Sequence, residues 1–290
     1  MKYIITGGAG FIGINYLHSL IDKKNKILCI DYLNNASNKE EILNLAKRKK
    51  IIFKKIDLSN FNKISKVIFD FKPNYVINFA AESHVDNSIK NPSKFIKSNI
   101  TGSFNLIECC RQFLIPENIL KKFIHISTDE VYGESELNEN KKIEQSVLCP
   151  TNPYAATKAG AELIVKSYYY SFKFPIIITR SNNIYGPNQY PEKVIPKFIK
   201  LLKENKKITI HGNGDNLRSF LHSEDVSEAF YLILIKGVIG EIYNIGSDKE
   251  YKILDVAKML IQKIKNSEDY DKYLEYVEDR PFNDKRYYIS

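Results

Sequence analysis

The chain has 290 residues, 43% of them hydrophobic, which is enough apolar content to bury one large core or two smaller ones. Its formal net charge of +9 comes from 37 Lys and 6 Arg spread along the chain, and no nucleic-acid motif accompanies them, so we expect no nucleic-acid partner. No apolar run reaches the roughly 18 residues that cross a bilayer, and no basic-then-apolar leader opens the chain, so we expect a cytoplasmic protein without a membrane segment.

Through residue 180, short apolar runs alternate with longer stretches of helical period, a pattern typical of βαβ units. The expected strands are 3–6, 26–31, 51–56, 75–80, 123–127 and 175–180, and the expected helices lie near 11–23, 39–48, 61–71, 92–113 and 152–172. Continuous apolar strands separated by helices predict an α/β fold with a Rossmann-type, doubly wound parallel sheet that helices cover on both faces.

Beyond residue 183, Gly and Pro punctuate shorter elements, which predicts a second, smaller lobe. The stretch "EIYNIGS" at 241–247 is expected to return a strand to the main sheet. We therefore expect a Rossmann domain made of 1–182 with about 219–246, and a substrate-binding lobe made of 183–218 with 247–290.

The first expected strand runs into "TGGAGFIG", which places Gly7, Gly10 and Gly13 at the start of a helix. Such glycines let the backbone turn tightly and approach a pyrophosphate, whose charge meets free N–H groups at the helix N-terminus. Asp31 ends the next strand, where a carboxylate binds ribose hydroxyls, and no Arg follows it. Because Asp31 would repel a 2′-phosphate, the sequence favours NAD over NADP, with an Asp that caps the next turn as the alternative.

In "PTNPYAATKAGAE", Thr151 or Asn152 can cap a helix with Pro153 in its first turn, so that Tyr154 and Lys158 fall on one face. Many surface helices carry such a pair without any function. Beside a dinucleotide, however, the ammonium and the positive nicotinamide ring would lower the pKa of the tyrosine. The pattern therefore indicates a tyrosine that accepts an alcohol proton.

The sequence resembles the extended short-chain dehydrogenase/reductase superfamily through GxxGxxG, "NFAAESHVD", a Ser/Thr at the end of the fifth strand and YxxxK. Within it, the chain is most similar to nucleotide-sugar 4,6-dehydratases of the UDP-glucose or dTDP-glucose type. The stretches that carry this likeness cover nearly the whole chain and are "STDEVYG", "PTNPYAATK", "RSNNIYGPNQYPEKVIPKFI", "IHGNGDNLRSFLHSEDV", "EIYNIGS" and "RPFNDKRYY".

The resemblance implies a hydro-lyase that uses NAD and ends with its cofactor oxidised, as it began. Tyr154, helped by Thr128 and Lys158, would remove the C4 hydroxyl proton while a hydride leaves C4. Glu130 would then abstract the C5 proton, Asp129 would protonate the departing C6 hydroxyl, and the hydride would return to C6. Adjacent carboxyl groups with opposite roles need different pKa values, which a desolvated site supplies. The alternative is an Asp and a Glu in a solvated turn.

The resemblance also implies binding residues. The cofactor positions are Gly7, Gly10, Phe11, Ile12, Gly13, Asp31, Asp57, Leu58, Ala80, Ala81, Tyr154 and Lys158. The nucleotide-sugar positions are Ser83, His84, Asn183, Glu192, Lys193, Arg218, Arg280 and Tyr287. The arginine forks match phosphate oxygens bidentately, whereas a structural hydrogen bond is an equal alternative for His84.

The expected substrate is a UDP-hexose, UDP-glucose or UDP-N-acetylglucosamine, because two of these stretches look most like plant rhamnose synthases. This implies rhamnose-type deoxysugar biosynthesis, with a downstream epimerase and reductase as separate proteins. A dTDP-glucose 4,6-dehydratase, a UDP-sugar 4-epimerase or decarboxylase, and a non-catalytic NAD-sensing protein stay open as alternatives. Relatives continue beyond "DKRYYIS", so the substrate lobe is expected to be shorter or differently closed.

Family members pair through the helices that match 92–113 and 152–172, so we expect a homodimer. The four cysteines and five histidines show no metal-ligand spacing, which predicts a reduced compartment and no metal site.

Overall fold

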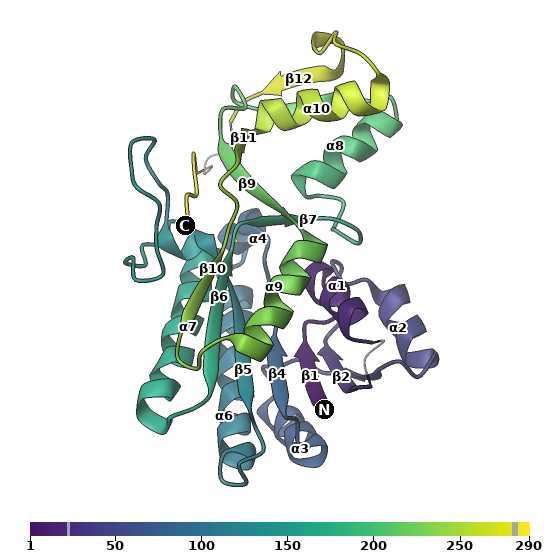
Figure 1. Cartoon of the computed structure of the whole chain (residues 1–290). Helices are drawn as coiled ribbons and strands as arrows, with labels where there is room; N and C mark the ends of the chain where they lie inside the picture. Colours follow the sequence, from purple (N-terminus) through teal and green to yellow (C-terminus); the bar gives the residue numbers. More distant parts are fainter. Residues whose placement is uncertain (22–23, 280–283) are drawn as a thin grey trace.

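The computed structural model describes residues 1–21, 24–279 and 284–290. Its centre is a parallel sheet of seven strands in the order β10-β6-β5-β4-β1-β2-β3 (Figure 1). The strands are β1 (Lys2–Thr6), β2 (Lys26–Asp31), β3 (Ile52–Lys55), β4 (Tyr75–Asn78), β5 (Lys122–Thr128), β6 (Ile176–Ser181) and β10 (Ile242–Ile245). The predicted doubly wound sheet is confirmed, and β10 is the predicted returning strand, paired parallel with β6.

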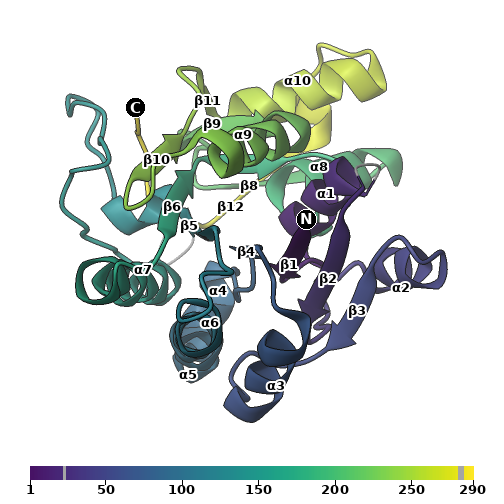
Figure 2. The same ribbon diagram turned by 60° about the horizontal axis from the view of Figure 1, so that its bottom comes forward.

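Helices cover both faces of this sheet (Figure 2). One face carries α1 (Phe11–Leu20), α2 (Lys39–Lys47) and α9 (Ser223–Lys236), and the other carries α3 (Phe61–Phe71), α6 (Gly102–Leu114) and α7 (Pro153–Phe172). The strands read as apolar runs because both of their faces are buried. Strand β1 lies between β2 and β4 in the sheet. The chain therefore adds β2 and β3 on one side of β1, and then β4, β5 and β6 on the other side. Such a reversal opens a crevice at the carboxyl ends of the strands.

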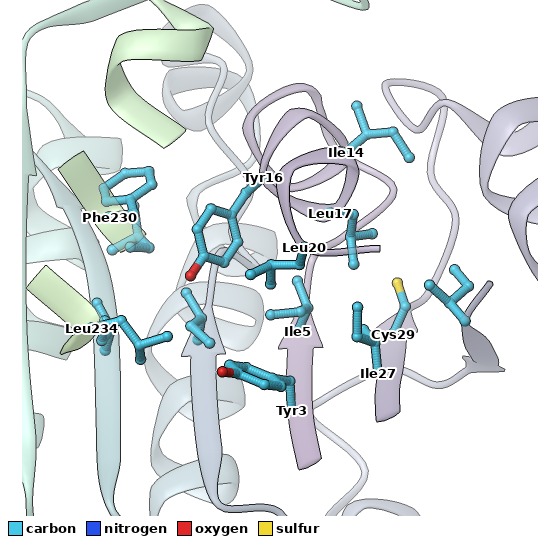
Figure 3. Close-up of a cluster of buried hydrophobic side chains, with 14 of the residues drawn as sticks. Tyr3, Ile5, Ile14, Tyr16, Leu17, Leu20, Ile27, Cys29, Phe230 and Leu234 are labelled. Atoms are coloured by element: carbon cyan, nitrogen blue, oxygen red, sulfur yellow. The ribbon is translucent and has the colours of Figure 1, made fainter. Parts of the chain in front are cut away.

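Apolar packing holds α1 against the sheet and against α9 (Figure 3). Tyr16 of α1 is fully buried, and its ring meets Phe230 of α9 edge-on with centroids 6.1 Å apart. Beneath α1 lie Ile5 of β1 and Cys29 of β2. Burying each large apolar side chain stabilises the fold by about 1.5–3 kcal/mol. This packing sets the position of α1 and of the glycine turn before it.

The second lobe lies beyond the carboxyl ends of the central strands (Figure 1). Its strands form a three-stranded and a two-stranded sheet, and α8 and α10 share an apolar core around Phe198, Leu202 and Ile261. The elements are β7 (Asn183–Tyr185), α8 (Val194–Lys203), β8 (Ile208–His211), β9 (Leu217–His222), β11 (Glu250–Lys252), α10 (Ile253–Lys265), a 3-10 turn at Asp271–Tyr273 and β12 (Leu274–Val277). The predicted domain bounds change from one lobe to the other at residue 219, inside β9, whereas β9 pairs with β7 and β11 of the second lobe. The domain bounds therefore remain a proposal.

The helix predicted at 92–113 is interrupted. After α4 (Val85–Lys90), α5 (Pro92–Phe95) leads into a π-helical segment, Ile96–Thr101, which precedes α6. Asn99 in that segment is buried, and its side chain bonds both the N–H and the C=O of Glu82, at 2.8 and 3.0 Å. Glu82 lies outside this helical stretch, so helical periodicity alone does not reveal these contacts. Within the described ranges, no helix is long and apolar enough to cross a membrane.

Candidate active site

A cavity of about 760 Å³ lies between the carboxyl ends of the central strands and the second lobe. Its size suits a small-molecule ligand. Most predicted site residues line it: Gly7, Gly10, Phe11, Ile12, Gly13, Asp31, Asp57, Leu58, Ala80, Ala81, Ser83, His84, Thr128, Glu130, Tyr154, Lys158, Asn183, Glu192, Lys193, Arg218 and Tyr287. Asp129 is not part of the lining, and Arg280 lies outside the described residues.

The glycine turn joins β1 to α1 at one end of this cavity. Gly7 has φ +67°, and a Cβ there would lie 2.5 Å from the backbone nitrogen of Ala80. A Cβ on Gly13 would lie 2.4 Å from the carbonyl oxygen of Gly7. Gly10 precedes α1 without any side-chain cap. Close backbone packing therefore requires glycine at positions 7 and 13, and the uncapped start of α1 offers backbone N–H groups to a pyrophosphate.

Asp31 ends β2 beside this turn. Its carboxylate accepts hydrogen bonds from the backbone N–H groups of Ala9, at 3.0 Å, and Leu33, at 2.8 Å. Burial raises the pKa of Asp31, while these hydrogen bonds act against that rise. The carboxylate thus lies where the sequence predicts a ribose-binding group, and it also ties the glycine turn to the end of β2.

Tyr154 and Lys158 project from the first turns of α7. Asn152 caps this helix, because its Oδ1 accepts from the N–H of Ala155 at 2.9 Å. The ammonium of Lys158 donates to the carbonyl of Ile126 in β5 at 2.5 Å, and burial lowers the pKa of Lys158 to about 8. The predicted helix cap and the predicted shared helix face are therefore both present in the fold.

The sequence predicts that Lys158 and a bound nicotinamide ring lower the pKa of Tyr154. The protein's own groups instead raise this pKa, so the predicted fall is wrong for the chain without NAD. Burial raises this pKa most, and the charge of Glu130 raises it further. A hydrogen bond with Thr128 acts in the opposite direction. Tyr154 is therefore a protonated hydroxyl in the isolated chain, held beside the threonine that ends β5.

Asp129 and Glu130 begin a 3-10 turn, Asp129–Tyr132, directly after β5. Asp129 is only 2% exposed, and its two oxygens accept from Asn182, at 2.8 Å, and from Thr128, at 3.2 Å. Burial raises the pKa of Asp129 to about 6. Burial and then the charge of Asp129 raise the pKa of Glu130 to about 7. The two carboxyl groups therefore do not lie in a solvated turn.

Arg218 of β9 and Tyr287 face these carboxyl groups from the second lobe. The guanidinium donates to the backbone carbonyls of Asp284, at 2.7 Å, and Leu217, at 2.8 Å, and lies 4.8 Å from the centre of the Tyr287 ring. The positive charge of Arg218 acts to lower the pKa of Asp129 and of Glu130. Arg218 thus brings a fixed positive charge to the cavity wall.

The loop before α8 meets the loop after β4 across the cavity. His84 Nε2 lies 3.5 Å from a carboxylate oxygen of Glu192, and Lys193 Nζ donates to the carbonyl of Ser83 at 3.5 Å. Asn183 lines the cavity at the start of β7. Four of the predicted sugar-nucleotide residues are therefore brought together from two segments, Ser83 and His84 from one and Glu192 and Lys193 from the other.

Several lining residues were not predicted. Tyr32, Asn34, Glu82 and Lys94 line the cavity near Asp31, and Asn182 lies beside Asp129. Asn182 follows β6 directly, so the rule that strand ends meet at one edge could have found it. Among residues 1–21, 24–279 and 284–290, no group of three His, Cys, Asp or Glu side chains could hold a metal ion.

Residues 4–290 match the family model described as GDP-mannose 4,6 dehydratase. The chain is 43% identical to a dTDP-D-glucose 4,6-dehydratase of Dictyostelium discoideum, over all of this chain and 75% of that protein. It is 42% identical to a trifunctional UDP-glucose 4,6-dehydratase/UDP-4-keto-6-deoxy-D-glucose 3,5-epimerase/UDP-4-keto-L-rhamnose-reductase of Arabidopsis thaliana, over 99% of this chain. The chain spans only 43% of the length of that plant protein.

The crystal structure of a dTDP-glucose 4,6-dehydratase from Streptomyces venezuelae, solved with NAD bound, is similar with a TM-score of 0.91 and 31% identity, over 100% of this chain and 88% of that chain. Solved UDP-sugar 4-epimerases are also similar, so the fold alone does not distinguish the reactions. The family match nevertheless covers almost every residue, and both curated relatives are dehydratases. This chain belongs to the GDP-mannose 4,6-dehydratase family and is a nucleotide-sugar 4,6-dehydratase, a hydro-lyase.

Proposed function

We propose that this protein uses NAD to convert a nucleoside-diphosphate glucose into its 4-keto-6-deoxy derivative. One observation carries the proposal: Thr128, Glu130 and Tyr154 line the same cavity as the glycine turn and Asp31. The glycine turn, the backbone N–H groups at the start of α1 and the Asp31 carboxylate fit a dinucleotide without a 2′-phosphate. When bound, NAD supplies a hydride acceptor at C4 and the same hydride for C6.

The chain's own residues supply the proton chemistry. Tyr154 would accept the proton of the C4 hydroxyl as the phenolate, a form that the hydrogen bond with Thr128 favours and that the positive charge of the nicotinamide ring would favour further once NAD is bound. Lys158 follows it by one turn of α7. Glu130, with a pKa of about 7, is ionised in part of the population near neutral pH and takes the C5 proton. Asp129 would deliver a proton to the departing C6 hydroxyl; it lies behind the cavity lining and its pKa of about 6 is lower than that of Glu130, so this role requires the bound ligands to reverse the order of the two pKa values. Arg218 holds the diphosphate by its charge.

For the sugar nucleotide, we propose UDP-glucose first and UDP-N-acetylglucosamine and dTDP-glucose as alternatives. The plant relative is named for UDP-glucose, and the Dictyostelium and Streptomyces proteins are named for dTDP-glucose, so relatives support both bases. The test incubates the protein with each of these three nucleotides, and separately with UDP-glucuronate, and measures product mass. Loss of one water supports the proposal, whereas an isomer of unchanged mass indicates 4-epimerisation, and loss of carbon dioxide from UDP-glucuronate indicates decarboxylation.

We also propose that the later epimerase and reductase steps belong to separate proteins, because the Dictyostelium relative is named for the dehydratase activity alone. A homodimer is proposed as well. Large apolar side chains are exposed on the paired helices, with Leu163 of α7 61% exposed and Phe104 of α6 41% exposed. Burial against a second copy would remove these surfaces from water.

A further inference from the structure

A hydrogen bond crosses the carboxyl end of β1. Tyr32 follows β2 directly, and its hydroxyl donates to the carboxylate of Glu82, which follows β4. Because β1 lies between β2 and β4 in the sheet, this bond spans the edge where the glycine turn begins. Tyr32 and Glu82 also line the cavity. The bond therefore joins the two walls between which a pyrophosphate and its adenosine ribose would lie.

The carboxylate of Glu82 has two more hydrogen-bonding or ionic partners. Asn34 Nδ2 donates to it at 3.2 Å, and Lys94 Nζ lies 2.9 Å from the same oxygen. The Glu82 side chain is 9% exposed, whereas that of Lys94 is 51% exposed. Burial alone would raise the pKa of Glu82, but the hydrogen bonds from Tyr32, Lys94 and Asn34 bring it below its ordinary value. Glu82 is thus a buried, ionised group with three partners rather than a solvated surface charge.

The backbone of Glu82 is held as firmly as its side chain. Asn99 accepts from the N–H of Glu82 at 2.8 Å and donates to its carbonyl at 3.0 Å, and it also donates to Thr157 of α7 at 2.9 Å. Asn99 lies in the π-helical segment that interrupts the predicted helix. Glu82 is therefore anchored to α7, while Tyr32 and Asn34 lie in the loop between β2 and α2 and bond to it from there.

We infer that Glu82 is a positioning residue for the cofactor: with Tyr32, Asn34 and Lys94 it forms a clasp across the adenosine half of the cavity that slows release of the dinucleotide. This inference rests on the proposed function, in which NAD occupies the cavity. A reaction that returns its cofactor to the starting oxidation state needs no exchange of cofactor between turnovers. Slow release is therefore compatible with rapid catalysis.

The test measures how fast radiolabelled NAD leaves the 290-residue protein after excess unlabelled NAD is added. Glu82→Gln keeps the side-chain shape and removes the charge, and Tyr32→Phe removes only the donor. Each variant should release NAD about tenfold faster, since a hydrogen bond to a charged group is typically strong enough for such a change. Tyr32→Phe should have a smaller effect in the Glu82→Gln background than in the parent, because the amide oxygen of Gln accepts only a weaker, neutral hydrogen bond from Tyr32.

Glu204→Gln is the matched control, because Glu204 also pairs with a lysine, Lys206 at 2.8 Å, but lies at the end of α8 and outside the cavity lining. The control should release NAD at the parent rate. Thermal unfolding of the NAD-free proteins should be similar, which separates a clasp from a general structural role. If Glu82→Gln fails to fold, the rate of NAD release from Tyr32→Phe alone decides whether the clasp exists.

Release from both clasp variants at the parent rate overturns the inference and leaves the proposed function standing. A folded parent protein that holds no NAD overturns both. Faster release from the clasp variants with an unchanged control supports the clasp.

Discussion

Asn182 donates a 2.8 Å hydrogen bond to Oδ2 of Asp129. The bond follows from strand register, because the last residues of β5 and β6 pair in the sheet and the next residue of each chain segment carries one of the partners. Asp129 is thereby held in the protein interior, while Glu130, the next residue, faces the cavity. One strand end thus presents two carboxyl groups in different surroundings.

This difference predicts the behaviour of Asp129→Asn and Glu130→Gln. Each change nearly preserves shape but removes one proton-transfer group, so each should still oxidise C4 and fail to eliminate water. Loss of a general acid or base typically slows a reaction about 100-fold to 10,000-fold. In a single-turnover experiment with UDP-glucose, reduced-nicotinamide absorbance should accumulate. Parent-like turnover by both variants would mean that these carboxyl groups are not catalytic.

Tyr154→Phe should behave differently, because it removes the group that accepts the C4 proton. We expect almost no reduced-nicotinamide absorbance in the same experiment and a loss of turnover of about 100-fold or more. The ring remains able to pack against Phe95, whose centroid lies 6.4 Å away, so the fold should be retained. Hydride transfer at the parent rate would exclude Tyr154 as the base.

The raised pKa values also predict how stability depends on pH. The folded-state pKa values of about 6 for Asp129 and about 7 for Glu130 lie above the ordinary values of 3.8 and 4.5. The folded state thus binds these protons more tightly, so their stabilising contribution is complete below about pH 4 and is lost as the pH rises through 6 to 7. The double variant Asp129→Asn/Glu130→Gln should avoid that loss and be more stable than the parent at pH 8.

The expected difference is on the order of 3–6 kcal/mol, since each of the two pKa values is raised by more than about 2 units and each unit corresponds to about 1.4 kcal/mol. Urea unfolding at pH 4 and pH 8 measures it. The parent and the double variant should differ more at pH 8 than at pH 4. An equal difference at both pH values would show that the two carboxyl groups do not carry the pH dependence.

The proposed homodimer predicts that Leu163→Glu produces monomers. Leu163 lies with Ala156 and Gly160 along the outer face of α7, where a buried carboxylate without a partner would be strongly unfavourable. Light scattering at micromolar concentration should give twice the monomer mass for the parent and the monomer mass for the variant. Leu232→Glu, an exposed leucine on α9, is the control and should stay dimeric. A monomeric parent would contradict the proposal.

Much of the fold was accessible from local sequence alone. The apolar runs of β1 to β6, the glycine turn around Gly7 and the position of Asp31 at a strand end all follow from periodicity and from spacing within about 30 residues. The cap at Asn152 and the shared face of Tyr154 and Lys158 are likewise local, because helix geometry determines which residues lie one turn apart. The parallel order of the sheet follows from the alternation of strands and helices.

Contacts between distant segments were decided only by the tertiary structure. The raised pKa of Tyr154 depends on its burial beside Glu130, which lies on a different element 24 residues earlier and reaches it through the packing of α7 against β5. The link from Tyr32 to Glu82 joins residues 50 positions apart across the end of β1. Desolvation and hydrogen-bond partners depend on which segments the sheet order brings together, so no local pattern contains them.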